Sequence, residues 1–395
     1  MSDASPLADK GWLAERGRAT AQARTIIVKV GSAVLTNAAG LDGAVMRGLA
    51  DQLAALKAAG PKGRRLILVT SAAVAAGRAV LAAHDRSADT TGLSARQAVA
   101  AVGQCQLMRV WDEAFARHGI PTAQVLLTRE DLRARQRFLN ARNTFAELLA
   151  WGVLPIVNEN DTVSVQELKF GDNDSLSSLL ANLVGADLCV NLTSAPGVRA
   201  ADPRTDPDAP VLDHIDDAAA LDLNRMCGGK TSVGTGGMYS KLRAARRSAQ
   251  IGVPTLILPG RETDVLTRAF EPGSRAGTWV RPSSHAISRR KFWLAYQADP
   301  AGAVVIDDGA ADALLHKGGS LLPGGVRNVE GSFQKGALVS VRHAGNDIGV
   351  GLTNYTAAEL KKIMGLKRIE VAAVLGDAHY PEVIHRDNLL LDAAV

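Results

Sequence analysis

The feature that most constrains the fold is an alternation of short β-branched runs with longer segments of helical periodicity, which continues over about 260 residues. The expected strands are 25–30, 65–70, 123–127, 154–157, 188–192 and 255–257, and the expected helices are 43–59, 95–118, 138–150, 175–184 and 241–251. Alternation of this kind predicts an α/β domain with a doubly wound, mainly parallel sheet and helices on both of its faces.

The sequence pattern changes after residue 277, from alternating strands and helices to short strands and turns. A chain of 395 residues is too long for one typical domain, and turn formers and charges are frequent over 278–290, which predicts a linker there. We therefore expect an N-terminal extension at 1–24, a first domain at 25–277 and a small β-barrel domain at 291–395. The strands expected in the barrel are 304–306, 332–336, 338–341 and 348–351.

Cysteine content, apolar runs and net charge indicate the cellular compartment and the kinds of partner to expect. Its three cysteines, Cys105, Cys189 and Cys227, match no zinc ligand pattern and cannot close a disulfide framework, which favours a reducing cytoplasm. No apolar run reaches the roughly 18 residues of a membrane span, and 1–24 lacks the apolar core of a signal sequence. A net charge of +5 on a chain of this length permits nucleic acid or anionic substrates but argues for neither.

Polar and glycine residues follow the predicted strands, where ligands bind in open α/β sheets. Lys29 and Gly31 end the first strand, Ser71 follows the second, and the clusters 158–161 (NEND) and 171–174 (GDND) follow the strand at 154–157. Each has an ordinary interpretation, since Lys29 could extend from a strand end into solvent and the second cluster could cap a helix. Two such clusters within some fifteen residues favour a polar pocket that recognises an amino group and orients a cation.

The strongest single stretch is 234–241 (GTGGMYSK), a glycine loop that leads into a helix. Exposed backbone amides and the charge of Lys241 near the helix start suit a phosphate group. The spacing is not that of a Walker loop, and a merely flexible entry to the helix is the alternative.

Taken in this order, the segments resemble the amino acid kinase family, and specifically its glutamate 5-kinases. The resemblance covers nearly the whole chain from about residue 25. It is carried by VKVG at 28–31, VTSA at 69–72, RFLNARNT at 137–144, VNEND at 157–161, GDND at 171–174, ADPR at 201–204 and GTGGM at 234–238 with Lys241.

This resemblance implies ATP-dependent phosphorylation of the γ-carboxylate of L-glutamate to γ-glutamyl phosphate, the first step of proline biosynthesis. By resemblance, Lys29 and Lys241 neutralise the transferring phosphoryl group and Asp174 holds the two lysines. Glutamate would be bound by Ser71, Asp161 and Asn173. The residues implied for ATP are Lys29, Gly31, Thr193, Ser194, Thr235, Gly236, Gly237, Met238 and Lys241, with Mg²⁺ as cofactor and no protein ligand assigned to it. Transfer to an ionised carboxylate needs positioning and cationic stabilisation rather than a strong base.

The resemblance further implies a homo-oligomer, either a dimer or a tetramer, and proline as feedback inhibitor. Three residues depart from the family pattern: Ala72 stands where glycine is usual, Ser194 where aspartate is usual, and Arg199 where an aromatic residue is common. We interpret Ser194 and Arg199 as a retuning of nucleotide contacts and Ala72 as a change in the backbone near glutamate.

From about residue 291 the chain resembles a PUA domain, through IDDGA at 306–310, GGSLLP at 318–323 and VIHRD at 383–387. PUA domains bind RNA in other proteins. Here acidic residues offset the basic ones and aromatic residues for base stacking are few, so a structural or regulatory role outweighs RNA binding. Two alternatives remain for the whole chain: phosphorylation of a different amino-acid carboxylate, and a catalytically weak RNA-binding or regulatory protein.

Overall fold

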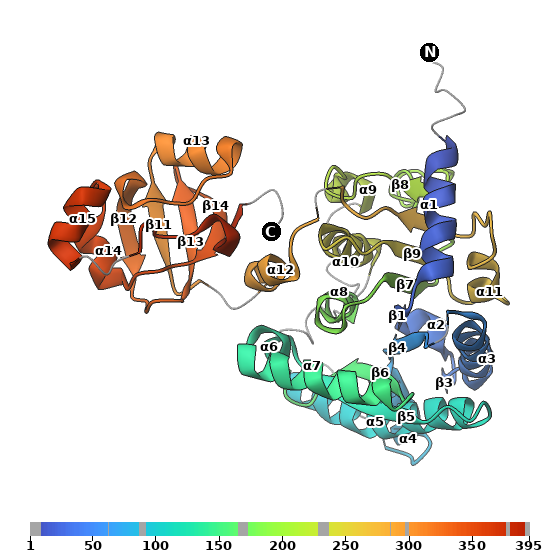
Figure 1. The fold of residues 1–395 in the computed structure, drawn as a ribbon. Coiled ribbons are helices and arrows are strands. Elements are labelled where there is room, and N and C mark those ends of the chain that lie inside the picture. The colour runs from blue at the N-terminus through green and yellow to red at the C-terminus, as the bar shows by residue number, and fades with distance from the viewer. Residues whose placement is uncertain are drawn as a thin grey trace. The chain divides into compact units, whose positions relative to one another are not determined.

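The computed structural model describes residues 9–61, 63–86, 92–164, 173–227, 237–284, 286–296, 300–376 and 380–391 (Figure 1). The chain divides into two compact units, Met1–Ala286 and Ile287–Val395. This division falls within the segment 278–290 that the sequence predicts as linker. The first residues of that segment form β10 (Thr278–Val280), which belongs to the sheet of the first unit.

An eight-stranded sheet in the order β5-β6-β4-β1-β7-β9-β10-β8 organises the first unit. Its other strands are β1 (Thr25–Val30), β4 (Arg65–Val69), β5 (Thr122–Leu127), β6 (Leu154–Glu159), β7 (Leu188–Thr193), β8 (His214–Ile215) and β9 (Thr255–Pro259). Neighbours from β5 to β9 are parallel, and β10 runs antiparallel to β9. A short hairpin, β2 (Thr36–Asn37) and β3 (Gly40–Leu41), lies outside this sheet. The predicted mainly parallel sheet is confirmed.

Helices cover both faces of this sheet. The helices are α1 (Asp9–Gln22), α2 (Ser32–Leu35), α3 (Gly43–Ala59), α4 (Ala73–Ala82), α5 (Leu93–Ala116), α6 (Arg129–Arg133), α7 (Arg135–Ala150), α8 (Asn173–Val184), α9 (Leu223–Cys227), α10 (Met238–Gln250) and α11 (Val265–Ala269). Figure 1 shows α8 and α10 on one side of the central strands and α3 and α11 on the other. All residues of β1, β6 and β7 are buried, which explains why the sequences of these strands are mainly apolar.

Two glycines bring α4 and α5 into backbone contact. A Cβ atom at Gly77 would lie 1.9 Å from the carbonyl oxygen of Val99, and one at Gly103 would lie 1.8 Å from that of Ala73. Larger residues at either position would force the helices apart. The approach therefore fixes α5 against the first turn of α4, directly after the end of β4.

The N-terminal helix α1 is attached to the opposite end of the first unit's chain. The Trp12 side chain is buried, Arg16 Nη2 donates to the carbonyl oxygen of Ala276 (3.0 Å), and Glu15 forms an ion pair with Arg281 (2.7 Å). The segment predicted as an N-terminal extension thus contributes a helix to the packed unit.

The second unit has its own sheet, in the order β12-β11-β13-β14-β15, which is antiparallel except for the pair β11–β13. Its elements are α12 (Arg289–Tyr296), β11 (Gly302–Ile306), α13 (Asp308–Lys317), η2 (Pro323–Gly325), β12 (Val326–Gly331), β13 (Leu338–His343), β14 (Asn346–Leu352), α14 (Ala357–Ile363), α15 (Arg368–Leu375), η3 (Arg386–Asn388) and β15 (Leu389–Leu391). Buried aliphatic residues, among them Val304, Val339 and Leu360, form its core.

One strand predicted for this unit is wrong. Residues 332–336 form a loop and turn, and the strand precedes them as β12. Gly331 and Gly336, which flank the loop, both have φ of +83°, a left-handed conformation that ends extended structure. In the described parts of both units, no helix combines the length and the apolarity needed to cross a membrane.

Candidate active site

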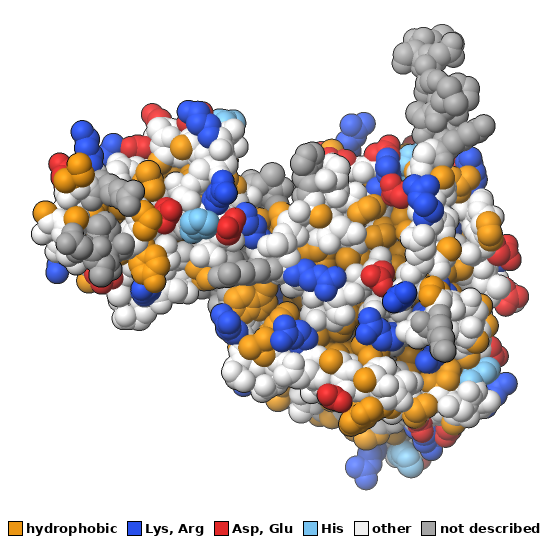
Figure 2. Space-filling view, viewed as in Figure 1, with side chains coloured by type: hydrophobic (Ala, Val, Ile, Leu, Met, Phe, Trp, Pro, Cys, Tyr) orange, Lys and Arg blue, Asp and Glu red, His pale blue; other side chains and the backbone are white. Residues whose placement is uncertain are grey.

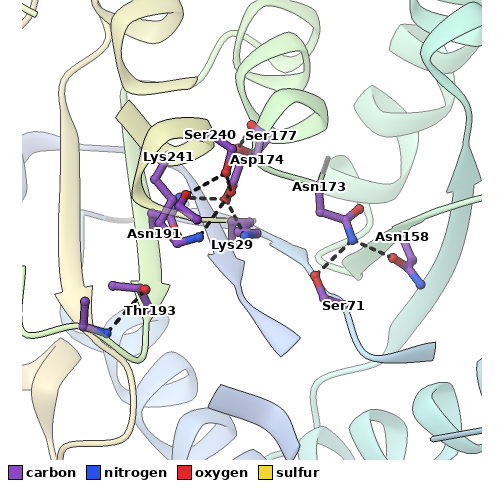
Figure 3. A network of polar contacts seen from close by, with 12 residues as sticks. Lys29, Ser71, Asn158, Asn173, Asp174, Ser177, Asn191, Thr193, Ser240 and Lys241 are labelled. Atoms are coloured by element: carbon purple, nitrogen blue, oxygen red, sulfur yellow. Dashed lines mark hydrogen bonds and ion pairs between the residues drawn. The ribbon is translucent and has the colours of Figure 1, made fainter. Parts of the chain in front are cut away.

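Two lysines and one aspartate from three different elements meet on the face of the sheet that α8 and α10 cover (Figure 3). Lys29 lies near the end of β1, Asp174 is in the first turn of α8, and Lys241 is in the first turn of α10. Lys29 Nζ contacts Asp174 Oδ1, and Lys241 Nζ lies 3.2 Å from Asp174 Oδ2. The side chain of Asp174 is 0% exposed and those of both lysines are 5% exposed.

Two neutral donors complete the surroundings of this carboxylate. Ser240 Oγ donates to Asp174 Oδ2 at 2.6 Å, and Asn191 Nδ2 donates to Asp174 Oδ1 at 3.0 Å. Burial alone would raise the pKa of Asp174, but the charges of Lys29 and Lys241 and the hydrogen bonds to the carboxylate hold that pKa well below its usual value. These three side chains together carry one net positive charge, which suits an anion.

The backbone beside Lys29 is open. A Cβ atom at Gly31 would lie 3.9 Å from Lys29 Nζ and 3.5 Å from the carbonyl oxygen of Leu192, to which the Gly31 amide donates at 3.1 Å. Because residue 31 is a glycine, no side chain lies between Lys29 and the space beyond the strand ends. A phosphate that approaches Lys29 would require this space to be free.

A second polar cluster adjoins the first, because Asn173 directly precedes Asp174. Asn173 Nδ2 donates to Ser71 Oγ (3.0 Å), at the end of β4, and to Asn158 Oδ1 (3.1 Å), on β6 (Figure 3). Asn173 Oδ1 is buried and has no hydrogen-bond partner among the described residues. The structure thus brings Ser71 and Asn173 together, and it leaves an acceptor oxygen for a ligand to satisfy.

The other predicted residues of the amino-acid and nucleotide sites that the structure describes lie at the same strand ends or at the start of α10. Asp161 follows β6 in a turn and is partly buried. Thr193 is the last residue of β7 and is buried, while Ser194 after it is exposed. Gly237 and Met238 begin α10. Thr235 and Gly236, like Gly171 and Asp172 of the second acidic cluster, lie outside the described residues.

Two of the departures from the family pattern have visible structural consequences. Arg199 Nη1 donates to the carbonyl oxygens of Pro207 (3.0 Å) and Ala209 (2.7 Å), so its guanidinium holds the following loop. Ala72 adopts a φ of +85°, the left-handed conformation that costs an L-residue about 1–2 kcal/mol relative to glycine. It stands immediately before α4, between Ser71 and the glycine contact with α5.

The described residues offer no ready-made cluster of metal-binding side chains. No group of three or more histidine, cysteine, aspartate or glutamate side chains in the described ranges is arranged to hold a metal ion. Both oxygens of Asp174 accept from lysine ammonium groups, which excludes this carboxylate as a free ligand. These residues therefore fit a metal ion that enters with the phosphates of a nucleotide, as Mg²⁺ commonly does.

Asn158 and Ser240 lie in the predicted segments 158–161 and 234–241 but were given no role of their own. Asn191 and Gln104, whose Oε1 accepts from Asn158 Nδ2 at 2.8 Å, were not predicted at all. Asn191 carried a usable signal, because an amide inside the apolar run 188–192 must find a buried partner. Gln104 carried none, since a single glutamine in a long helix is typical of a solvated surface.

Comparison with known proteins gives matches over both units. The model of the amino acid kinase family matches residues 24–259, and the model of the PUA domain matches residues 302–375. A glutamate 5-kinase of Nitratidesulfovibrio vulgaris (strain DP4) is 61% identical over 387 residues, which cover 97% of this chain and 100% of the relative. The glutamate 5-kinase of Oleidesulfovibrio alaskensis is 58% identical, with 97% and 100% covered, and that of Maridesulfovibrio salexigens is 53% identical, with 95% and 98% covered.

Proposed function

The chain belongs to the amino acid kinase family, and from this premise we propose that it transfers the γ-phosphoryl group of ATP to the γ-carboxylate of L-glutamate, giving γ-glutamyl phosphate. The near full-length likeness to relatives named glutamate 5-kinase supports this substrate. The observation that carries the proposal is the buried pair of lysines that share the single carboxylate of Asp174.

The chemistry assigned to the two lysines follows from the charge of the transferring group. The acceptor carboxylate is already ionised at neutral pH, so no general base has to remove a proton. The phosphoryl group spreads negative charge over its oxygens during transfer, and ammonium groups aimed at it stabilise that charge in a site that excludes water. Lys29 and Lys241 fill this role, while Asp174 acts as a positioning residue that holds both ammonium groups without touching substrate.

The remaining site residues are assigned to binding. Ser71, Asn173 and Asp161 would hold glutamate, whose ammonium group suits carboxylate and amide acceptors. ATP would bind along Lys29, Gly31, Thr193, Ser194 and the segment 235–238 with Lys241, and Mg²⁺ would be held by its phosphates. The metal ion supplies charge neutralisation on those phosphates.

We extend the proposal to the setting of the reaction. The product would be the first intermediate towards proline, proline would act as feedback inhibitor, and the chain would form a dimer or tetramer in the cytoplasm. For the second unit we favour a structural or regulatory role over RNA binding. Arg342 pairs with Glu330 and Asp347, and Arg327 with Asp307, so much of the basic surface is compensated. Figure 2 shows basic and acidic side chains intermingled on the visible face of this unit.

The test is ATP consumption by the full chain with hydroxylamine present to trap an acyl phosphate as the hydroxamate. L-Glutamate, L-aspartate, an N-acylated glutamate and no amino acid form the substrate panel. We expect Mg²⁺-dependent hydroxamate formation with glutamate far above the other three. Dominant turnover of aspartate or of the N-acylated substrate would assign a sister activity, and no turnover combined with tight RNA binding at physiological salt would favour the regulatory alternative.

A further inference from the structure

We propose that Gln104 is a positioning residue for amino-acid binding: through Asn158, its carboxamide fixes the orientation of the Asn173 amide in the glutamate pocket. The inference deepens the proposed function and rests on it for the identity of the ligand. It concerns a residue on α5 that lies two hydrogen bonds away from Asn173.

The three amides form a chain of hydrogen bonds with one direction. Gln104 Oε1 accepts from Asn158 Nδ2 (2.8 Å), and Asn158 Oδ1 accepts from Asn173 Nδ2 (3.1 Å). Asn173 Nδ2 also donates to Ser71 Oγ (3.0 Å). Gln104 is only 9% exposed and Asn158 only 1% exposed, so neither amide can exchange these partners for bulk water.

The direction of these hydrogen bonds decides whether the pocket presents a donor or an acceptor to a ligand. Because Asn173 donates through its NH₂ group to both neighbours, its carbonyl oxygen is the atom left over, and this buried oxygen has no partner in the described structure. Ser71 Oγ accepts from Asn173 and therefore keeps its own proton to donate. The pair thus presents an acceptor for an ammonium group and a donor for a carboxylate, as the α-carbon end of an amino acid requires.

Gln104 sets this direction because an amide has one acceptor end and one donor end. If its NH₂ group faced Asn158, the Asn158 amide would have to turn, and the Asn173 amide would turn in response. Asn173 would then direct its NH₂ group at the ligand, where it would repel an ammonium group. The hydrogen bond that the Gln104 carbonyl accepts from Asn158 thus favours the orientation seen at Asn173, while Gln104 Nε2 is buried and has no hydrogen-bond partner among the described residues.

The backbone holds Gln104 firmly in this place. Its neighbour Gly103 closes to backbone contact with Ala73, as described above, so α5 cannot shift along α4. One further contact from the same helix reaches the end of β4, where Trp111 Nε1 donates to Thr70 Oγ1 at 2.9 Å. Helix α5 thus braces both strands that supply the pocket with Ser71 and Asn158.

A simpler role is possible for a buried glutamine, namely to satisfy Asn158 and so stabilise the fold. The two roles differ in what a substitution changes. Loss of a purely structural contact lowers the melting temperature and affects glutamate and ATP together, whereas loss of a positioning contact weakens glutamate binding selectively.

The experiment compares Gln104→Met, which keeps the shape and removes the amide, with Gln104→Glu, which keeps an acceptor oxygen. Gln106→Met, two positions along α5, is the matched control. Calorimetric titration of the full chain with L-glutamate gives Kd without turnover, and steady-state assays give KM for ATP and kcat. We expect Kd for glutamate to rise about tenfold in Gln104→Met, with KM for ATP and the melting temperature nearly unchanged. Kd should stay within about threefold of wild type in Gln104→Glu and Gln106→Met.

The outcomes separate this inference from the proposed function. An unchanged Kd in Gln104→Met, or equal losses in glutamate binding, ATP binding and melting temperature, overturns the positioning role. A Gln104→Glu variant as weak as Gln104→Met also overturns it, because the carbonyl would then not be the group that matters. If wild type binds glutamate but forms no hydroxamate, the proposed reaction fails while the inference stands on the Kd values. If wild type does not bind glutamate, both fail.

Discussion

Replacement of Asp174 by asparagine tests how the two catalytic lysines are held. The substitution keeps the size of the side chain and removes its charge, so the net charge of the cluster rises from one to two. Two ammonium groups with side chains only 5% exposed would then lose the carboxylate that they share. Removal of one partner from a buried ion pair costs about 3–5 kcal/mol, which corresponds to a fall of about 10 °C in Tm for a unit of this size.

The pH dependence gives the same test a second readout. The folded-state pKa of Asp174 lies below the ordinary value of 3.8, so its carboxylate contributes stability that is complete above that value. This contribution is lost as the pH falls through the folded-state pKa. The difference in stability between wild type and Asp174→Asn should therefore be constant near neutral pH and should narrow below about pH 4.

The assay is urea unfolding of wild type, Asp174→Asn, Lys241→Met and the double variant. Because Lys241→Met removes one of the two buried positive charges, the double variant should be more stable than Asp174→Asn alone, although both should be inactive. A double variant less stable than Asp174→Asn, or an Asp174→Asn variant within about 1 kcal/mol of wild type, would refute the shared-carboxylate argument.

Three further substitutions test other parts of the structure. Lys241→Met should lower kcat by about 10²–10³ while KM for glutamate changes little. A normal kcat would show that this lysine is not part of the phosphoryl site. Lys57→Met on α3 is the control. Ala72→Gly should raise the free energy of unfolding by about 0.5 kcal/mol, since relief of the left-handed strain exceeds the entropic cost of glycine; a lower urea midpoint would contradict this. Trp12→Ala should cost about 3–5 kcal/mol, whereas Trp151→Ala, at a side chain that is 68% exposed, should leave Tm unchanged.

The parallel sheet of the first unit could be predicted from the sequence because its central strands β1, β6 and β7 are buried and are therefore mainly apolar. Lys29, Asp174 and Lys241 could be placed individually, at a strand end and at two helix starts. Their convergence could not be read from periodicity, since it depends on the order in which the strands assemble, and it was anticipated only through the family resemblance.

Other features depend on contacts between distant segments and were out of reach. Gln104 acquires its partner only when α5 lies against the end of β6, which the Gly77 and Gly103 contact permits. The strand β10 pairs with β9 after a turn-rich stretch that resembles a linker, and the residues 332–336 have strand-like composition but follow a glycine that ends β12. The first two features depend on tertiary contacts, whereas the left-handed glycines at 331 and 336 account for the loop at 332–336.

The attachment of α1 has a consequence for the order in which the protein folds during synthesis. Glu15 and Arg281 are separated by more than 260 positions, and Arg16 reaches a carbonyl group equally far along the chain. The helix leaves the ribosome before the rest of this unit, and its partners are translated almost last in the unit. We expect α1 to remain unpacked until the end of the unit has been translated. The first unit would then complete its folding in a late step that brings together two segments separated by nearly the full length of the unit.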